Sequence, residues 1–172
     1  TNSWASNWTI EGWVYATSVP CQLFERSNLA SGFDFSSNVN ASGQVNFYYG
    51  ASTVGPTLAT VPVNTWTHVA VTYDGVRSNI YVSSNTIGTA NISTTVTGTQ
   101  AFVPTYSTHF GYNSVAGNYL NGNLADVRVS NVARYSGTTY VVPTAPFSTD
   151  SSTLLLLKSL AGQVGTTLEV QG

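Results

Sequence analysis

One ten-residue stretch, Trp66–Gly75 (WTHVAVTYDG), constrains the fold of this chain more than any other. Its side chains alternate for eight residues, which is the period-two pattern of a β-strand with two different faces. The stretch ends in an Asp-Gly pair, which favours a tight hairpin turn. Val69 and Val71 share one face of the predicted strand, and Ile80 can lie opposite them beyond the turn. The stretch therefore predicts a β-hairpin with one buried face.

Nearly every patterned segment shows the same alternation, and none has the spacing of a long helix. The gaps between these segments are rich in Gly, Asn, Ser and Pro, which supply turn geometry. Short strands with short polar connections pack as a two-sheet antiparallel sandwich, so the predicted fold class is all-β. The predicted strands are Trp8–Tyr15, Cys21–Arg26, Gly32–Ser36, Gln44–Tyr49, Thr57–Val61, Trp66–Asp74, Ser78–Ser83, Thr86–Ala90, Thr108–Tyr112, Asn123–Ser130 and Thr153–Lys158.

Three other segments carry specific predictions. Val96–Tyr106 lacks clean alternation and is expected to be a long loop. Asn131–Tyr135 is expected to form one helical turn, because Asn131 is a suitable N-cap. The continuous run Leu154–Leu157 predicts a last strand that is buried on both faces.

A length of 172 residues suits one domain. We expect that domain at residues 1–159, with residues 160–172 as a C-terminal extension leading out of it. The longest apolar run has the four residues of Leu154–Leu157, against the ~20 that a membrane-spanning helix needs, so no membrane partner is expected. Because the chain opens at Thr1 without a Met, we expect it to derive from a longer precursor.

Charged residues make up only 7% of the chain, and Ser, Thr and Asn take their place. Aromatic residues at 12% supply enough apolar material for a core, so the composition indicates a folded chain with a neutral, amide-rich surface. Five basic residues against seven acidic ones, scattered singly, make a nucleic-acid partner improbable. Cys21 stands alone and is expected to be a small buried side chain.

Three blocks together resemble the laminin-G-like jelly roll of the concanavalin A-like superfamily. They are WTHVAVTYDG, the segment Asn121–Val129 (NGNLADVRV) and Trp8–Tyr15 (WTIEGWVY). The resemblance implies a two-sheet jelly-roll sandwich and a protein that binds glycans, proteins or sometimes calcium. The closing pattern ARY … PTAPF … TLLLL is similar to that of laminin-G-like modules in tailed-phage virion proteins.

Catalysis is not expected. Hydrolysis of a glycosidic bond usually needs two carboxyl groups about 5–10 Å apart, and the sandwich glycosidases typically carry them as Glu-x-Asp-x-x-Glu on one strand. That array is absent here, although two carboxylates could still converge from different strands. His68 and His109 lack a nucleophile elbow or zinc-ligand spacing, so both are expected to be structural.

Asp126 is the carboxylate with the most interesting setting. Strict alternation would put Leu124, Asp126 and Arg128 on one side of their strand, with Val127 and Val129 on the other. A carboxylate beside an apolar face needs a partner, and two are considered. One is an ion pair with Arg128 or another Arg. The other is a structural calcium ion, which the resemblance implies and which takes carboxylate and carbonyl oxygens.

The segment from Tyr112 to Tyr119 is the best candidate for binding glycans. Tyr112 and Tyr119 offer flat apolar faces with polar tips, and Asn113 and Asn118 offer amides for sugar hydroxyls. The alternative is that these Tyr residues only pack a rim. Tyr48-Tyr49 is a second candidate, in which one ring must face inward. Trp8, Trp13 and Trp66 are expected to serve core or sheet packing.

These observations favour a non-catalytic module on the surface of a phage virion, in a capsid-decoration, spike or tail-fibre protein. Its lectin-like surface would bind host glycans, or other virion proteins would be its partners; a homo-oligomer is left open. The alternative is a carbohydrate-binding or adhesion module of a bacterial secreted or cell-surface protein.

Overall fold

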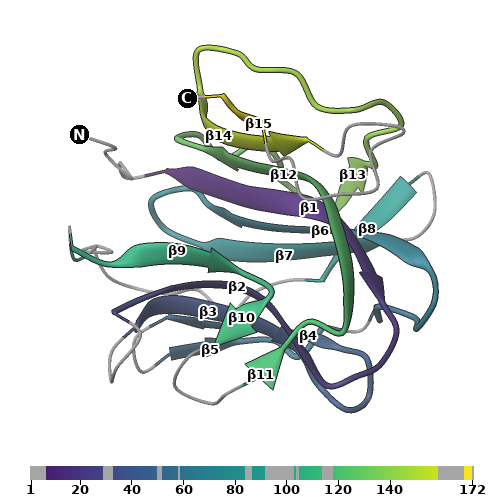
Figure 1. The fold of residues 1–172 in the computed structure, drawn as a ribbon. Helices are drawn as coiled ribbons and strands as arrows, with labels where there is room; N and C mark the ends of the chain where they lie inside the picture. The colour runs from purple at the N-terminus through teal and green to yellow at the C-terminus, as the bar shows by residue number, and fades with distance from the viewer. Residues whose placement is uncertain are drawn as a thin grey trace.

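The computed structural model confirms an all-β sandwich of two antiparallel sheets (Figure 1). It describes residues 7–28, 33–49, 52–57, 59–83, 87–91, 103, 105–113, 118–158 and 169–171, and these contain no helix. No helix there could therefore cross a membrane. The strands are β1 (Trp8–Ala16), β2 (Cys21–Ser27), β3 (Phe33–Val39), β4 (Val45–Tyr49), β5 (Ser52–Val54), β6 (Trp66–Tyr73), β7 (Ser78–Ser83), β8 (Ile87–Asn91), β9 (Ser107–Phe110), β10 (Tyr112–Asn113), β11 (Asn118–Tyr119), β12 (Gly122–Ser130), β13 (Thr139–Val141), β14 (Thr153–Lys158) and β15 (Glu169–Gln171).

Eight strands form the larger sheet in the order β13-β8-β7-β6-β1-β12-β14-β15, and five form the smaller in the order β5-β4-β3-β2-β9. Strand β1 lies between β6 and β12, far from both in sequence, as a jelly roll requires. The hairpin predicted from the Asp-Gly turn is β6–β7, in which Val71 pairs with Ile80. Strands β10 and β11 form a separate small hairpin.

The core lies between the two sheets and is built around Trp8. Its indole stacks on Phe35 of the smaller sheet, with ring centroids 5.5 Å apart and an interplanar angle of 18°. Phe47 and Tyr73 surround the same ring at 5.8 and 6.2 Å. Trp8, Phe35, Phe47 and Val71 are each 0% exposed, so alternating side chains of both sheets meet in one apolar layer.

Two strand predictions were wrong in detail. The described residues of Thr57–Val61 form no strand; among them Thr60 makes an isolated bridge, and the short β5 precedes the segment. The Thr57 hydroxyl accepts the Val45 N–H at 2.9 Å and the Thr57 carbonyl accepts Gln44 Nε2, so side chains replace part of the backbone ladder here. The predicted strand Thr108–Tyr112 is broken at Gly111, which has a φ of +69° and starts the β10–β11 hairpin.

A bulge in β12 corrects the predicted faces around Asp126. Asp126 has a φ of +48°, and β12 carries one more residue than β1 at this point. The extra residue resets the alternation, so Leu124 packs against the same core as Val127 and Val129. Arg128 faces the opposite side, as predicted.

The segment that follows β12 is not helical, in contrast to the turn predicted at Asn131–Tyr135. The Thr9 hydroxyl donates to the Val132 carbonyl at 2.7 Å and accepts the Arg134 N–H at 2.9 Å. These bonds hold the backbone extended against β1 instead of leaving its groups free for a helical turn.

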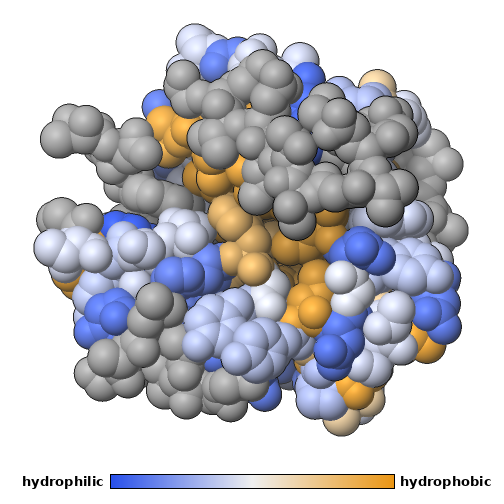
Figure 2. Space-filling view, in the orientation of Figure 1, coloured by the Kyte–Doolittle hydropathy of each residue, from blue (hydrophilic) through white to orange (hydrophobic). Residues whose placement is uncertain are grey.

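The leucine run is buried less completely than predicted. Leu156 is fully buried, whereas Leu154, Leu155 and Leu157 are half-buried. The eight-stranded sheet is wider than the five-stranded one, so β14 lies beyond the edge of its cover. Figure 2 shows apolar side chains reaching the surface between the two sheets on this side. Strand β15, inside the predicted extension, pairs with β14, while residues 159–168 and most of the predicted loop 96–106 lie outside the described residues.

Candidate functional site

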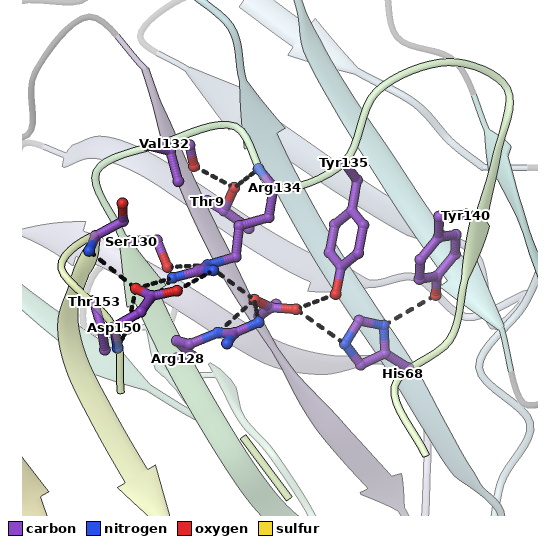
Figure 3. A network of polar contacts seen from close by, with 12 residues as sticks. Thr9, His68, Arg128, Ser130, Val132, Arg134, Tyr135, Tyr140, Asp150 and Thr153 are labelled. Atoms are coloured by element: carbon purple, nitrogen blue, oxygen red, sulfur yellow. Dashed lines mark hydrogen bonds and ion pairs between the residues drawn. The ribbon is translucent and has the colours of Figure 1, made fainter. Parts of the chain in front are cut away.

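A polar network lies on the outer face of the eight-stranded sheet, away from the core (Figure 3). Its centre is the fully buried carboxylate of Glu11. Arg128 donates to it at 2.8 Å through Nε and 2.7 Å through Nη2, and the Tyr135 hydroxyl donates at 2.6 Å. His68 Nε2 lies 3.4 Å from Glu11 Oε2, and His68 Nδ1 lies 3.0 Å from the Tyr140 hydroxyl oxygen. The prediction that His68 is a packed, hydrogen-bonded imidazole is confirmed.

Residues 131–150, which we call the strap, close this network from solvent. Burial raises the pKa of Tyr135 and Tyr140, and the charge of Glu11 raises it further, so both hydroxyls stay protonated. Burial alone would raise the pKa of Glu11, but hydrogen bonding from His68 and the charge of Arg128 hold it below its ordinary value. With both His68 and Glu11 fully buried, the network ties the strap to the sheet and offers no open site.

The outer face of the five-stranded sheet presents the more accessible polar surface. In β3 and β4 the core receives Phe35, Val39, Val45 and Phe47. Their neighbours in sequence point the other way because side chains alternate along a strand. A bulge between Gln22 and Phe24 lets β2 join this pattern. The outward side chains are Gln22, Glu25, Ser36, Asn38, Asn46 and Tyr48.

A pocket of about 240 Å³ opens on this face. Its walls are Pro20, Cys21, Asn38, Val39, Asn40, Ala41, Asn46, Tyr48 and Asn118, none of them charged. Asn46 Nδ2 donates to Asn38 Oδ1 at 3.3 Å. Among the described residues, the Asn38 amide nitrogen is then available as a donor to a ligand, and the Asn46 amide oxygen is available as an acceptor. Asn40 has a different role, since its Oδ1 accepts two backbone N–H groups and shapes the loop.

The predicted glycan residues form the β10–β11 hairpin, which folds over β2 at the rim of the pocket. Tyr112 pairs with Tyr119, their rings stacked with centroids 5.0 Å apart, and Tyr119 is 60% exposed. Asn118 lines the pocket, whereas Asn113 points inward and donates to Ser36 Oγ at 3.4 Å. The hairpin thus brings Asn118 to the site and offers the free face of Tyr119 beside it; residues 114–117 are outside the described residues.

Tyr48 is the member of the Tyr48-Tyr49 pair that faces outward into the pocket, while Tyr49 packs against the core. Asn38 and Asn46 were not among the residues predicted to bind a glycan. The available signal was the polar alternation of β3 and β4, which places both amides on the face opposite the core aromatics. Asn118 reaches these two amides only because of how the β10–β11 hairpin folds. No local sequence pattern predicts that arrangement.

Other acidic groups near this sheet are already engaged or enclosed. Asp34 lies 2.9 Å from Arg26 and accepts the Val103 N–H at 3.2 Å. Burial raises the pKa of Asp34, and the Val103 N–H and Arg26 oppose this shift. Glu25 is fully buried on the outward face. Neither carboxylate lines the pocket.

Asp126 is half-buried at the β12 bulge, and of the two partners considered for it, Arg128 is excluded because it binds Glu11. Burial raises the pKa of Asp126, and the charge of Lys158 partly offsets this. Among the described residues, no three or more His, Cys, Asp or Glu side chains lie together so that they could hold a metal ion. Calcium at Asp126 would depend on main-chain carbonyls beside one carboxylate, and it stays a prediction.

The remaining single-residue predictions concern Cys21 and three tryptophans. Cys21 is buried as expected, and burial raises its thiol pKa to about 11. Trp8 is in the core and Trp13 packs beneath the strap. Trp66 packs on the sheet as expected, with its ring 5.5 Å from that of its cross-strand neighbour Tyr15, although it is 42% exposed.

Two antiparallel sheets with an apolar layer between them define a β-sandwich of the jelly-roll class. The chain belongs to the concanavalin A-like lectin/glucanases superfamily. A laminin-G family model with this description matches residues 1–137. The laminin-G-like resemblance of the sequence motifs is therefore confirmed. No curated protein matches the chain.

Solved structures share the fold at low sequence identity. A proposed carbohydrate-binding protein from Bacteroides ovatus has a TM-score of 0.69 at 17% identity, covering 96% of this chain and 49% of that one. The chain thus spans about half of that protein. A heptameric SAP-like pentraxin from Limulus polyphemus has a TM-score of 0.54 at 17% identity, covering 76% and 66%. Domain 4 of a GH43 extracellular arabinanase from Geobacillus stearothermophilus, in complex with arabinotriose, has a TM-score of 0.52 at 15% identity, covering 74% and 62%.

Proposed function

We propose that this chain is a non-catalytic carbohydrate-binding module, with its site in the pocket on the outer face of the five-stranded sheet. The observation that carries the proposal is a pocket walled by amides and Tyr48 without a charged side chain. Sugar hydroxyls both donate and accept hydrogen bonds, and the amides of Asn38, Asn46 and Asn118 offer both. The Tyr48 and Tyr119 rings offer apolar faces for stacking. The carbohydrate ligand of the arabinanase domain supports this assignment.

The same pocket supports a neutral glycan as the ligand class. An anionic sugar is bound through charge-assisted hydrogen bonds from Arg or Lys, and the pocket walls contain neither. Its volume of about 240 Å³ is below the usual range for drug-sized ligands, so it fits one sugar unit better than a chain segment.

The absence of catalysis is part of the proposal. Asp34 is engaged by Arg26 and Glu25 is buried, which leaves no pair of carboxyl groups at the pocket walls. Incubation with a broad panel of polysaccharides should release no reducing ends above a buffer blank. A reproducible release that disappears in Glu25→Gln or Asp34→Asn would contradict a binding role.

For the carrier of the module we propose a phage virion surface, in a capsid-decoration, spike or tail-fibre protein. The neutral amide-rich composition and the closing segment that resembles phage modules support this carrier. Many displayed copies would turn weak single-site binding into useful adhesion. A bacterial secreted or cell-surface protein is the second candidate, favoured by the Bacteroides ovatus and Geobacillus stearothermophilus relatives. Neighbouring capsid and tail genes would distinguish the first from the second.

A glycan array probed with a multimerised domain tests the binding proposal. The parent should bind neutral glycans, and Tyr48→Ala and Asn118→Ala should each lower the signal at least severalfold. Asn123→Ala is the matched control, because Asn123 is an exposed amide on the eight-stranded sheet. Absence of binding by the parent multimer would contradict the function. Loss in the Asn123 variant alone would move the site to the other sheet.

A structural calcium ion at Asp126 is a separate proposal, supported by the half-buried carboxylate at the β12 bulge. An ion that binds only the folded state raises its stability by mass action. Adding a chelator should therefore lower the Tm of the parent, and Asp126→Asn should abolish this response. An unchanged melting curve would refute calcium at this position.

A further inference from the structure

A second polar cluster lies on the outer face of the five-stranded sheet, beneath the β10–β11 hairpin. Gln22 Nε2 donates to Ser36 Oγ at 2.9 Å, and Ser36 Oγ donates to Glu25 Oε2 at 3.5 Å. Gln22 and Glu25 share one face because of the β2 bulge, and both are 0% exposed. We call these three residues the Glu25 cluster. Their hydrogen bonds make the three side chains meet around Ser36.

Two oxygens of the Glu25 cluster have no hydrogen-bond donor in the described part of the chain: Gln22 Oε1 and Glu25 Oε1. The buried Nε2 of His109, the cross-strand neighbour of Glu25, also has no partner there. Buried polar atoms are almost always hydrogen-bonded or bound to an ion. Two unmatched acceptors, on side chains that both bond to Ser36, therefore point to a missing electropositive partner.

Because Glu25 is a buried carboxylate, its missing partner should carry a positive charge. The two other buried carboxylates among the described residues each face an arginine: Arg128 at Glu11 and Arg26 at Asp34. No ion pair joins Glu25 to a cationic side chain in the same set of residues. A buried carboxylate without a positive partner is strongly unfavourable. A bridging water could complete the hydrogen bonds, but it could not balance the charge.

We propose that the Glu25 cluster binds one monovalent metal cation through Gln22 Oε1 and Glu25 Oε1. Hard cations take carboxylate and amide oxygens as ligands, and Ser36 orients both of these side chains. One carboxylate balances one positive charge, whereas a divalent ion would leave a net positive charge buried. The cation also supports the hairpin, since Asn113 donates to Ser36 Oγ. The Glu25 cluster is distinct from the pocket walls and from Asp126.

Thermal melting in sodium chloride and in choline chloride at equal ionic strength tests this site. Choline is too large for the cluster, so a difference in Tm isolates specific binding from screening. At a sodium concentration near ten times the Kd, the parent should melt about 3–6 °C higher in sodium chloride. Glu25→Gln should lose this difference, because it removes the charge and keeps the shape. Asp126→Asn, a matched control on the other sheet, should keep it.

Crystals soaked in a thallium(I) salt provide a readout that does not depend on a variant folding. An anomalous peak within bonding distance of Gln22 Oε1 and Glu25 Oε1 would support the site. Equal melting of the parent in both salts, with no such peak, would overturn it. Stabilisation by calcium but not by sodium, lost in Glu25→Gln, would overturn the assignment of a monovalent ion.

Discussion

At the residue scale, the fold depends on how each buried carboxylate is neutralised. Glu11 receives hydrogen bonds from Arg128 and Tyr135 and lies beside His68, so its ionised form is favoured despite burial. The result is a folded-state pKa below the reference value of 4.5. A depressed pKa means that the ionised group stabilises the fold above pH 4.5, and that this contribution is lost as the pH falls through the folded-state pKa.

Acid unfolding should therefore depend on Glu11. Between pH 7 and pH 3 the free energy of unfolding of the parent should fall, most steeply below about pH 4.5. In Glu11→Gln this part of the pH dependence should be missing, although the variant is less stable at neutral pH. Urea titrations of both proteins at several pH values measure the difference. Equal slopes for the two proteins would contradict the assigned role of Glu11.

A second prediction at the residue scale concerns Val71 in the core. It is 0% exposed between the sheets, so Val71→Ala should lower the free energy of unfolding by about 1–3 kcal/mol. Val76 is the matched control, since it is 60% exposed in the β6–β7 turn, and Val76→Ala should stay within about 0.5 kcal/mol of the parent. Chemical denaturation of both variants checks this, and a Val71→Ala protein as stable as the parent would contradict the fold.

At the scale of elements, the sequence predicts those strands and hairpins that are encoded locally, by alternating side chains and by turn residues. Strands β6 and β7 follow from their two-faced pattern and the Asp-Gly turn. The β12 bulge could not be predicted, because the extra residue is set by pairing with β1, which lies more than a hundred positions away. The two-residue strands β10 and β11 are too short to show any period. The predicted Tyr112–Tyr119 segment contributes Asn118 to the pocket, whereas Asn38 and Asn46 of the same pocket were not predicted.

A prediction at this scale concerns the strap, whose first residues Thr9 of β1 holds through the Val132 carbonyl and the Arg134 N–H. Thr9→Val removes both hydrogen bonds and keeps the shape, so the free energy of unfolding should fall by about 1–3 kcal/mol. Thr9→Ser retains the hydroxyl and should lose clearly less. The two variants are compared by urea denaturation. Equal losses would show that packing of the Thr9 methyl group, not its hydroxyl, holds the strap.

At the scale of the whole molecule, the two outer faces of the sandwich have different roles. The strap and its polar network close the outer face of the eight-stranded sheet, whereas the five-stranded sheet keeps a pocket open. This pocket is uncharged, so glycan affinity should be nearly independent of ionic strength. With sodium held constant, raising choline chloride from about 0.05 to about 0.5 M should change the Kd by less than about twofold. A large salt-dependent loss would indicate binding through charges elsewhere.

The central claim is that a neutral glycan binds in the pocket of the five-stranded sheet. The most direct test is an NMR titration of the ¹⁵N-labelled domain with the strongest neutral ligand from the array, followed through the side-chain amides of asparagine. The account predicts that the largest shifts occur at Asn38, Asn46 and Asn118, with Asn123 unchanged. Shifts centred on Asn123 and the surface near Trp66, with the three pocket amides unmoved, would contradict it.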